Sequence, residues 1–156
     1  MPDASFEDIT QFLQARRVAM VGVSRDPKHF SRALFREFVA QGYDTVPVNP
    51  QAAEIEGRPS FARIADIAPA AEAALIMTSA AAVDHVLTEC NDAGIHNIWI
   101  YRAVHDGEAH EHAVESCRSR GSAVIEGYCP FMFLPKPAFV HRLHRFFMKI
   151  VGSYPL

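Results

Sequence analysis

The chain has 156 residues and a mass of 17.3 kDa, which fits one folded domain and leaves little room for a second. Apolar residues make up 49% of the chain and charged residues 21%, so the composition excludes a disordered protein. Fifteen Lys and Arg against eighteen Asp and Glu give a formal net charge of −3. This balance argues against a surface built to neutralise the phosphates of nucleic acid.

The cysteines and the first residues of the chain predict a cytoplasmic protein. The three cysteines, Cys90, Cys117 and Cys129, form no C-x-x-C motif, and an odd number fits a reducing compartment better than a disulfide scaffold. Acidic residues precede the first basic one in residues 1–16, the reverse of a secretory signal. The longest uncharged stretch, residues 73–83, falls short of the roughly 20 residues that cross a membrane.

The hydrophobic pattern alternates between helical and strand periodicity, without repeats or low-complexity tracts. Apolar residues at helical spacing predict helices over residues 5–15, 30–41, 80–93 and 108–120, and a short helical turn over 61–67. Continuous apolar runs predict buried strands over residues 17–23, 44–48, 73–77, 97–101 and 122–126. We expect an irregular stretch around Gly57 and Pro59. The alternation is typical of the doubly wound α/β class, with a five-stranded, mostly parallel, Rossmann-like sheet and helices on both faces.

A C-terminal extension, residues 137–156, follows this predicted domain of residues 1–136. Apolar residues between Phe139 and Val151 form one stripe of a helix, and histidine, arginine and lysine occupy much of the remainder. Such basic amphipathic helices bind membranes or nucleic acid in some proteins. Burial of each phenylalanine of the adjacent pair Phe146-Phe147 stabilises the folded protein by about 2 kcal/mol. We therefore expect the helix to pack on the domain or on the partner subunit of a homodimer. An interaction module that acts through this helix is an alternative function.

Ligands of open parallel sheets bind beyond the carboxyl ends of the strands, which directs attention to the loop after the first strand. Gly22 permits a tight turn there, and the helix that starts near Ser31 offers unpaired backbone N–H groups to an anion. Three cations, Arg25, Lys28 and Arg32, lie within the same loop. Together these features predict a phosphate site. The alternative is that Ser31 only caps the helix and the three cations are solvated.

Two common nucleotide-binding motifs are absent from the sequence. Gly22 is the only glycine between residues 18 and 41, so the loop lacks G-x-G-x-x-G. The second strand ends in Val48-Asn49-Pro50, where dinucleotide enzymes place an acidic residue that holds the ribose. No G-x-x-x-x-G-K-[ST] occurs anywhere in the chain. These differences argue against NAD binding and against ATP hydrolysis.

The order of the motifs resembles a known family. VAMVGVSRDPKHFSR is followed by GYDTVPVNP, by a stretch with E-I-E-G, by IADI and finally by GYCP. Over residues 16–135 this succession resembles the small stand-alone coenzyme A (CoA)-binding proteins. Their Rossmann-like fold is shared with the CoA-binding domain of succinyl-CoA synthetase. The resemblance implies a small-molecule ligand, CoA or an acyl-CoA.

The resemblance also implies which residues contact the cofactor. The loop from Gly22 and the helix start at Ser31 match the pyrophosphate site, and two later strand ends match segments that line the same crevice. We add Lys28 and Arg32 on electrostatic grounds, because CoA carries a 3′-phosphate besides its pyrophosphate. The predicted cofactor-binding residues are Gly22, Val23, Ser24, Arg25, Lys28, Ser31, Arg32, Val48, Asn49, Pro50, Met77, Thr78 and Ser79.

Two segments depart from the pattern of that family. This chain has Lys28-His29-Phe30 where members carry a small or polar residue and further prolines. It has Tyr101-Arg102-Ala103-Val104 where members tend to carry a Gln-x-Gly-like turn, which leaves the path of the pantetheine arm open.

The residues favour binding over catalysis. The chemistry of the larger synthetases belongs to a second domain with its own histidine, for which 156 residues leave no space. The alternative is a thiol or redox enzyme, or an acyl-handling one, in which Cys129 of the GYCP motif reacts with a thiol or acyl substrate. We expect Cys90 and Cys117 to be packing residues.

The histidine-rich segment around residue 110 does not predict a metal site. His110 and His112 point about 200° apart on a helix, so they cannot bind one ion together with His105 from regular geometry. We therefore predict a CoA-binding protein with no metal.

Overall fold

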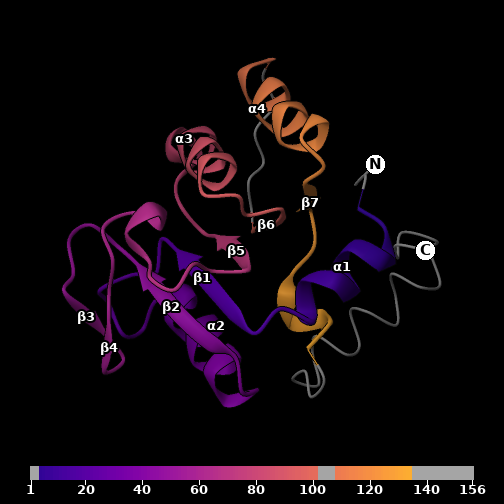
Figure 1. Cartoon of the computed structure of the whole chain (residues 1–156). Helices are drawn as coiled ribbons and strands as arrows, with labels where there is room; N and C mark the ends of the chain where they lie inside the picture. Colours follow the sequence, from indigo (N-terminus) through magenta and orange to yellow (C-terminus); the bar gives the residue numbers. More distant parts are fainter. Residues whose placement is uncertain (1–3, 102–107, 135–156) are drawn as a thin grey trace.

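A computed structural model of the chain describes residues 4–101 and 108–134. Its helices are α1 (Phe6–Leu13), α2 (Phe30–Ala40), α3 (Ala80–Asp92) and α4 (Glu108–Ser119). The main sheet consists of β1 (Arg17–Val21), β2 (Asp44–Val48), β5 (Ala73–Ile76), β6 (Asn97–Ile100) and β7 (Ala123–Glu126). Its strand order is β2-β1-β5-β6-β7, and every neighbouring pair is parallel. The predicted α/β class with a Rossmann-like sheet is confirmed (Figure 1).

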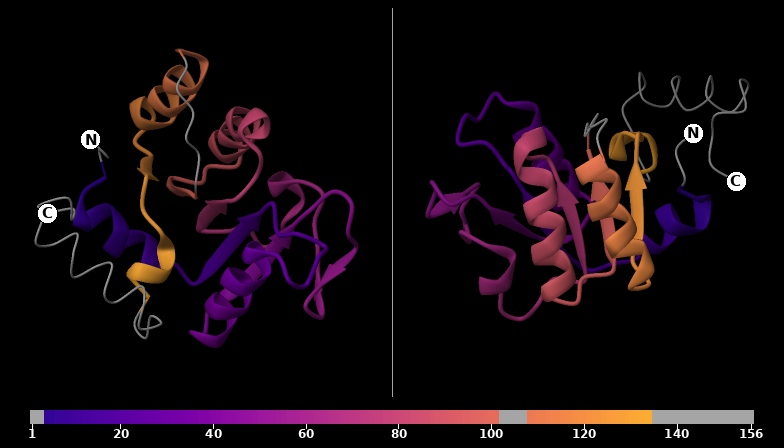
Figure 2. Two further views of the ribbon diagram at one scale, coloured as in Figure 1. Left: turned by 180° about the vertical axis from the view of Figure 1, so that it is seen from behind. Right: turned by 90° about the horizontal axis from the view of Figure 1, so that it is seen from above.

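Helices cover both faces of the sheet because successive strand residues point to opposite sides. Val18 and Met20 of β1 pack with α1 and α2 in one hydrophobic cluster, whereas Ala19 and Val21 pack with α3 and α4 in a second. Figure 2 shows α3 and α4 side by side on their face. Since both faces are covered, the strands are apolar except at or next to their ends, and this is what made them visible in the sequence.

The ends of the elements follow local chemistry. Helix α1 begins with the expected capping box: the Ser5 hydroxyl accepts a hydrogen bond from the N–H of Asp8, whose carboxylate accepts one from the N–H of Ser5. Strand β1 ends at Val21, two residues earlier than predicted, because Gly22 adopts a φ of +89° and turns the chain out of the sheet.

A small hairpin occupies the stretch that the sequence analysis expected to be irregular. Strands β3 (Glu54–Ile55) and β4 (Arg58–Pro59) pair in antiparallel orientation around Glu56 and Gly57, both of which have positive φ. The two-residue strands are too short for a periodicity signal, and Glu is not a usual turn residue at positive φ. The hairpin lies beside β2, where Phe61 forms a bridge with Val48.

Two 3-10 turns complete the described structure, η1 (Ile64–Asp66) within the predicted helical turn and η2 (Pro130–Met132) after β7. No helix of the described residues is long and apolar enough to cross a membrane. The predicted helix over residues 139–151, the division of the chain after residue 136 and His105 lie outside the described residues.

Candidate functional site

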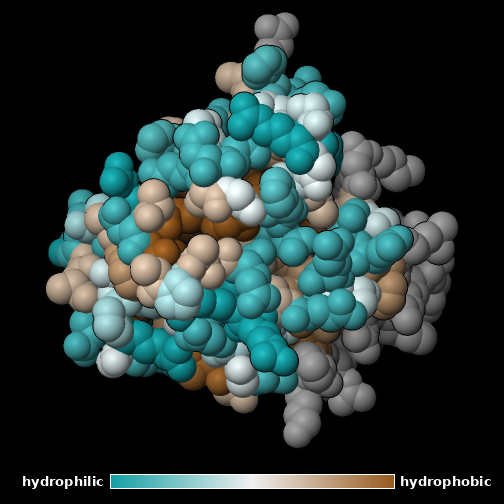
Figure 3. Space-filling model, in the orientation of Figure 1, coloured by the Kyte–Doolittle hydropathy of each residue, from teal (hydrophilic) through white to brown (hydrophobic). Residues whose placement is uncertain are grey.

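A cavity of about 730 Å³ opens at the carboxyl ends of β1, β2 and β5. The chain leaves β1 towards β2 on one side and returns to β5 on the other, so the cavity lies where the strand order reverses. Three strand-end segments line it, residues 21–24, 48–51 and 77–79, together with one face of α3. Figure 3 shows apolar side chains in a hollow beneath α3, surrounded by hydrophilic ones.

The structure brings together most of the predicted cofactor-binding residues at this cavity. Those that line it are Gly22, Val23, Ser24, Val48, Asn49, Pro50, Met77, Thr78 and Ser79. Arg25, Lys28, Ser31 and Arg32 do not line it. The cavity is therefore built from three strand ends and α3, and the three cations predicted to lie with them, two in the loop and Arg32 in α2, are outside its lining.

Gly22 allows two of these strand ends to approach each other. A Cβ atom at this position would lie 2.8 Å from the carbonyl carbon of Met77 and 2.9 Å from the backbone nitrogen of Thr78. The N–H of Gly22 donates to the carbonyl of Val48 at 3.0 Å, which ties β1 to β2 as well. A glycine is thus required here both for its φ and for the close packing of backbone on backbone.

Asn49 joins the loops after β1 and β2. Its Nδ2 donates to the carbonyl of Val23 at 2.9 Å, and its Oδ1 accepts from the N–H of Gln51 at 2.8 Å. Both ends of the amide are occupied, so Asn49 holds the wall of the cavity in place.

Ser31 has a different role from the one considered in the sequence analysis. Helix α2 begins at Phe30 with His29 as its N-cap, whose Nδ1 accepts from the N–H of Ser31 at 3.2 Å. The alternative in which Ser31 caps the helix is therefore wrong. The Ser31 side chain, in a residue only 1% exposed, instead accepts from the N–H of Ser24 at 2.8 Å and pins the loop to the helix.

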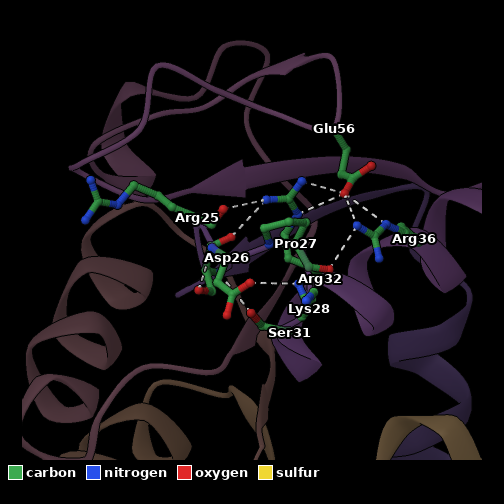
Figure 4. A network of polar contacts seen from close by, with 9 residues as sticks. Arg25, Asp26, Pro27, Lys28, Ser31, Arg32, Arg36 and Glu56 are labelled. Carbon is green, nitrogen blue, oxygen red and sulfur yellow. Dashed lines mark hydrogen bonds and ion pairs between the residues drawn. The ribbon is translucent and has the colours of Figure 1, made fainter.

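Arg32 is held by an acidic partner that lies 24 residues further along the chain. The Nη2 atoms of Arg32 and Arg36 lie 2.6 and 2.7 Å from Oε1 of Glu56, at the tip of the β3–β4 hairpin. Hydrogen bonds from Arg36 and Arg32 lower the pKa of the Glu56 carboxyl and keep it charged. Figure 4 shows both guanidinium groups converging on Glu56, whereas the Arg25 side chain points away.

The same arginines also hold the loop between β1 and α2. Nη1 of Arg32 donates to the carbonyls of Ser24 and Arg25 at 3.3 and 3.1 Å, and Nη2 of Arg36 donates to the carbonyl of Pro27 at 3.1 Å. Arg32 therefore shapes the loop from outside the cavity. Lys28, like Arg25, is exposed and does not line the cavity.

Sequence reasoning missed several residues of the cavity. His29 and Arg63 line it, as do His85 and Glu89 on α3. His29 was noticed only as a departure from a family pattern. The α3 residues stand at helical spacing, but only the packing of α3 shows that this side of the helix faces the strand-end loops.

His110, considered above as a metal ligand, instead contacts two carboxylates of the protein. It is 6% exposed, with Nδ1 at 3.0 Å from Oδ1 of Asp84 and Nε2 at 2.8 Å from Oε1 of Glu126. Burial by itself lowers the pKa of His110, but the hydrogen bonds and charges of Glu126 and Asp84 outweigh burial and raise it. The neighbouring His112 is exposed, on the other side of α4. Among the described residues, no group of three or more His, Cys, Asp or Glu side chains is arranged so that it could hold a metal ion.

The cysteines lie outside the cavity. Cys90 and Cys117 are buried between α3, α4 and the sheet, as predicted for packing residues, and burial raises the pKa of both thiols. Cys129 is half-buried between β7 and η2, and it does not line the cavity. Its use as a nucleophile stays a prediction.

A comparison with known proteins identifies the family. The sequence profile described as "CoA binding domain" matches residues 16–135, more than half of the chain and the same span as the resemblance noted above. The chain belongs to the CoA-binding domain family. The switch-point cavity is accordingly the candidate site of this CoA-binding domain.

A curated relative and two solved structures are similar to this chain. The alpha subunit of an ADP-forming acetate–CoA ligase II from Pyrococcus furiosus is 28% identical over 93 residues, which are 59% of this chain and 20% of that subunit. A hypothetical protein from Pyrococcus horikoshii OT3 has the same fold, with a TM-score of 0.73, 20% identity and coverage of 82% of this chain and 88% of that one. The dinucleotide-forming acetyl-CoA synthetase 1 of Ca. Korarchaeum cryptofilum matches with a TM-score of 0.60 and 25% identity, over 70% of this chain and 25% of the synthetase chain.

Proposed function

We propose that this CoA-binding domain binds CoA or an acyl-CoA in the switch-point cavity. The observation that carries the proposal is the cavity itself, at the strand ends where sheets of this kind bind nucleotides. Its volume of about 730 Å³ falls within the range of small-molecule sites. The apolar side chains of Val21, Val48 and Val86 offer a surface to the adenine ring.

The polar groups at one end of the cavity suit the phosphates. The Ser24 hydroxyl oxygen accepts from the N–H of Asp26 at 3.1 Å, so its proton is free to be donated to a ligand oxygen. Arg25 and Lys28 lie outside the cavity in the same loop and attract an anion by long-range electrostatics. We assign Ser24 to direct contact and the two exposed cations to attraction.

We propose binding alone and no reaction for this chain. The match to the ligase subunit spans one fifth of that subunit, and so it carries no activity of the whole ligase to this chain. The three strand-end segments that line the cavity are also those that the family resemblance associates with CoA.

Isothermal calorimetry with CoA at moderate salt tests this proposal. We expect saturable heat from CoA, a raised melting temperature and no binding of NAD. Ala82→Phe, which fills the cavity from α3, should weaken CoA binding at least about ten-fold, since a ligand and a new phenyl ring cannot share the space. Ala81→Phe is the matched control, because Ala81 is exposed and does not line the cavity. NAD binding without CoA binding would contradict the proposal, as would equal effects of the two variants.

A further inference from the structure

His29 lines the cavity, but the proposed function above gives its side chain no role. We propose that His29 is a ligand-binding residue that donates a hydrogen bond from Nε2 to a phosphate oxygen, with Ser31 fixing the orientation of the ring. This inference rests on the proposed function and adds to it a residue outside the predicted cofactor-binding set.

The contacts of Nδ1 determine which ring nitrogen carries the proton. The backbone N–H of Ser31 donates to Nδ1 of His29 at 3.2 Å, and a backbone N–H can only donate. Nδ1 is therefore the acceptor, and the neutral ring carries its proton on Nε2. The Ser31 hydroxyl, 2.8 Å from Nδ1, donates to the same nitrogen while it accepts from the N–H of Ser24.

This arrangement fixes the ring at the cavity. Ser31 is almost fully buried, whereas His29 is exposed, and their contact is partly buried. Among the described residues, no hydrogen bond or ion pair involves Nε2 of His29. One side of the imidazole is thus anchored, and the ring offers a donor at the other.

The other basic side chains that line the cavity differ from that of His29 in having a carboxylate partner. Nη2 of Arg63 lies 3.4 Å from Oδ1 of Asp66, and Nε2 of His85 lies 3.3 Å from Oε1 of Glu89. Arg32, outside the cavity, is paired with Glu56. Of these side chains, His29 is the one without a carboxylate partner among the described residues, and its Nε2–H donor suits an oxygen of an anion.

A second group of the cavity also lacks a partner. Oγ1 of Thr78 is buried and makes no hydrogen bond to any described residue. Thr78 follows β5 and lies against Gly22, at the base of the loop that carries Ser24 and leads to His29. A buried hydroxyl without a partner is unfavourable, and rotation of the Thr78 side chain towards the cavity would let a ligand oxygen satisfy it. His29, Ser24 and Thr78 thus bring three hydrogen-bond donors to one cavity.

His29→Asn separates this role from that of the helix cap. Asparagine is among the best N-cap residues, so this variant should keep α2 capped and keep the melting temperature of the wild type. It lacks a donor at the position of Nε2. Since hydrogen bonds to charged groups are worth about 1.5–3 kcal/mol, we expect CoA to bind roughly 10- to 100-fold more weakly.

Lys28→Ala is the matched control for charge in the same loop. Lys28 is exposed and outside the cavity, so its effect on CoA affinity should disappear at high salt, whereas the effect of His29→Asn should persist. Equal affinity of His29→Asn and wild type for CoA would overturn the inference and leave the proposed function standing. A loss of CoA affinity in His29→Asn that vanishes at high salt, as the loss in Lys28→Ala is expected to do, would also overturn the inference and leave the proposed function standing.

Nitrogen NMR of the histidine rings gives a readout that needs no CoA. We expect the free protein to show His29 protonated at Nε2, and inorganic pyrophosphate to shift this resonance. If the wild type fails to bind CoA, the proposed function fails, and the pyrophosphate titration still decides on His29. A ring protonated at Nδ1 alone, or a His29 resonance that pyrophosphate leaves unchanged, would overturn the inference.

Discussion

At the scale of single residues, the cavity depends on small groups in close contact. Gly22 must adopt a positive φ and must also leave room for the backbone of Met77 and Thr78. No residue with a Cβ atom meets both requirements. Ser31 and Asn49 act through hydrogen bonds to the loop after β1. These three residues were predicted from the sequence as ligand-binding, and the structure gives each of them a contact within the protein as well.

Gly22→Ala should destabilise the protein and weaken CoA binding together. The left-handed φ costs about 1–2 kcal/mol for alanine, and the clash with the backbone of Met77 adds to it. Gly57→Ala has the same backbone cost without a clash, since nothing lies within 4 Å of its Cβ position. Urea unfolding of both variants checks the difference. An equal loss of unfolding free energy would show that the close approach at Gly22 does not matter.

Thr78→Val should have opposite effects on stability and on binding. The valine removes a buried hydroxyl that has no partner among the described residues, so we expect the free energy of unfolding to rise by up to about 1 kcal/mol. The same change should weaken CoA binding, because it removes a donor from the cavity. Thermal melts with and without CoA measure both effects. A variant that is less stable, or that binds CoA unchanged, would contradict the assignment.

At the scale of elements, ionic contacts join segments that are distant in the sequence. Glu56 connects the β3–β4 hairpin to α2 and, through Arg32 and Arg36, to the loop beside the cavity. His110 connects α4 to α3 and β7. Neither connection follows from local sequence, because each pairs residues that only the fold brings together.

Glu56→Gln should loosen the loop between β1 and α2. Without the charge on Glu56, the guanidinium groups lose the partner that holds them against the carbonyls of the loop. We expect faster tryptic cleavage after Arg25 and Lys28, measured by mass spectrometry of the cut sites. Glu54→Gln, in the same hairpin and exposed, should leave the cleavage rate unchanged. Equal rates in the two variants would exclude this role of Glu56.

His110 should make the stability of the protein depend on pH. Because Glu126 and Asp84 raise its pKa in the folded protein, its stabilising effect is fully present below the unfolded value of about 6.5. The effect is then lost as the pH rises through the folded pKa. The difference in unfolding free energy between wild type and His110→Gln should therefore shrink with rising pH. His112→Gln, at an exposed position of the same helix, is the control; a constant difference for His110→Gln would contradict the pKa direction.

At the scale of the whole molecule, the oligomeric state stays a prediction from the sequence. Residues 139–151 have the pattern of a basic amphipathic helix, which we expect to cover the domain or a partner subunit. Deletion of residues 137–156 tests this. Light scattering should then report a change from dimer to monomer if the segment forms the subunit contact. An unchanged number of subunits with a lower melting temperature would instead show that the segment packs on its own domain.

The sequence by itself determined the fold class, because strands buried on both faces are continuously apolar and the helices between them are amphipathic. It also located the cavity, since the ends of parallel strands meet at one edge of the sheet. Only the tertiary structure decided which side chains face that cavity. Arg32 is turned to Glu56 and His29 lines the cavity, although the two residues are only three positions apart at the start of α2. The direction of a charged side chain depends on partners that are close in space, and those partners can lie far away along the chain.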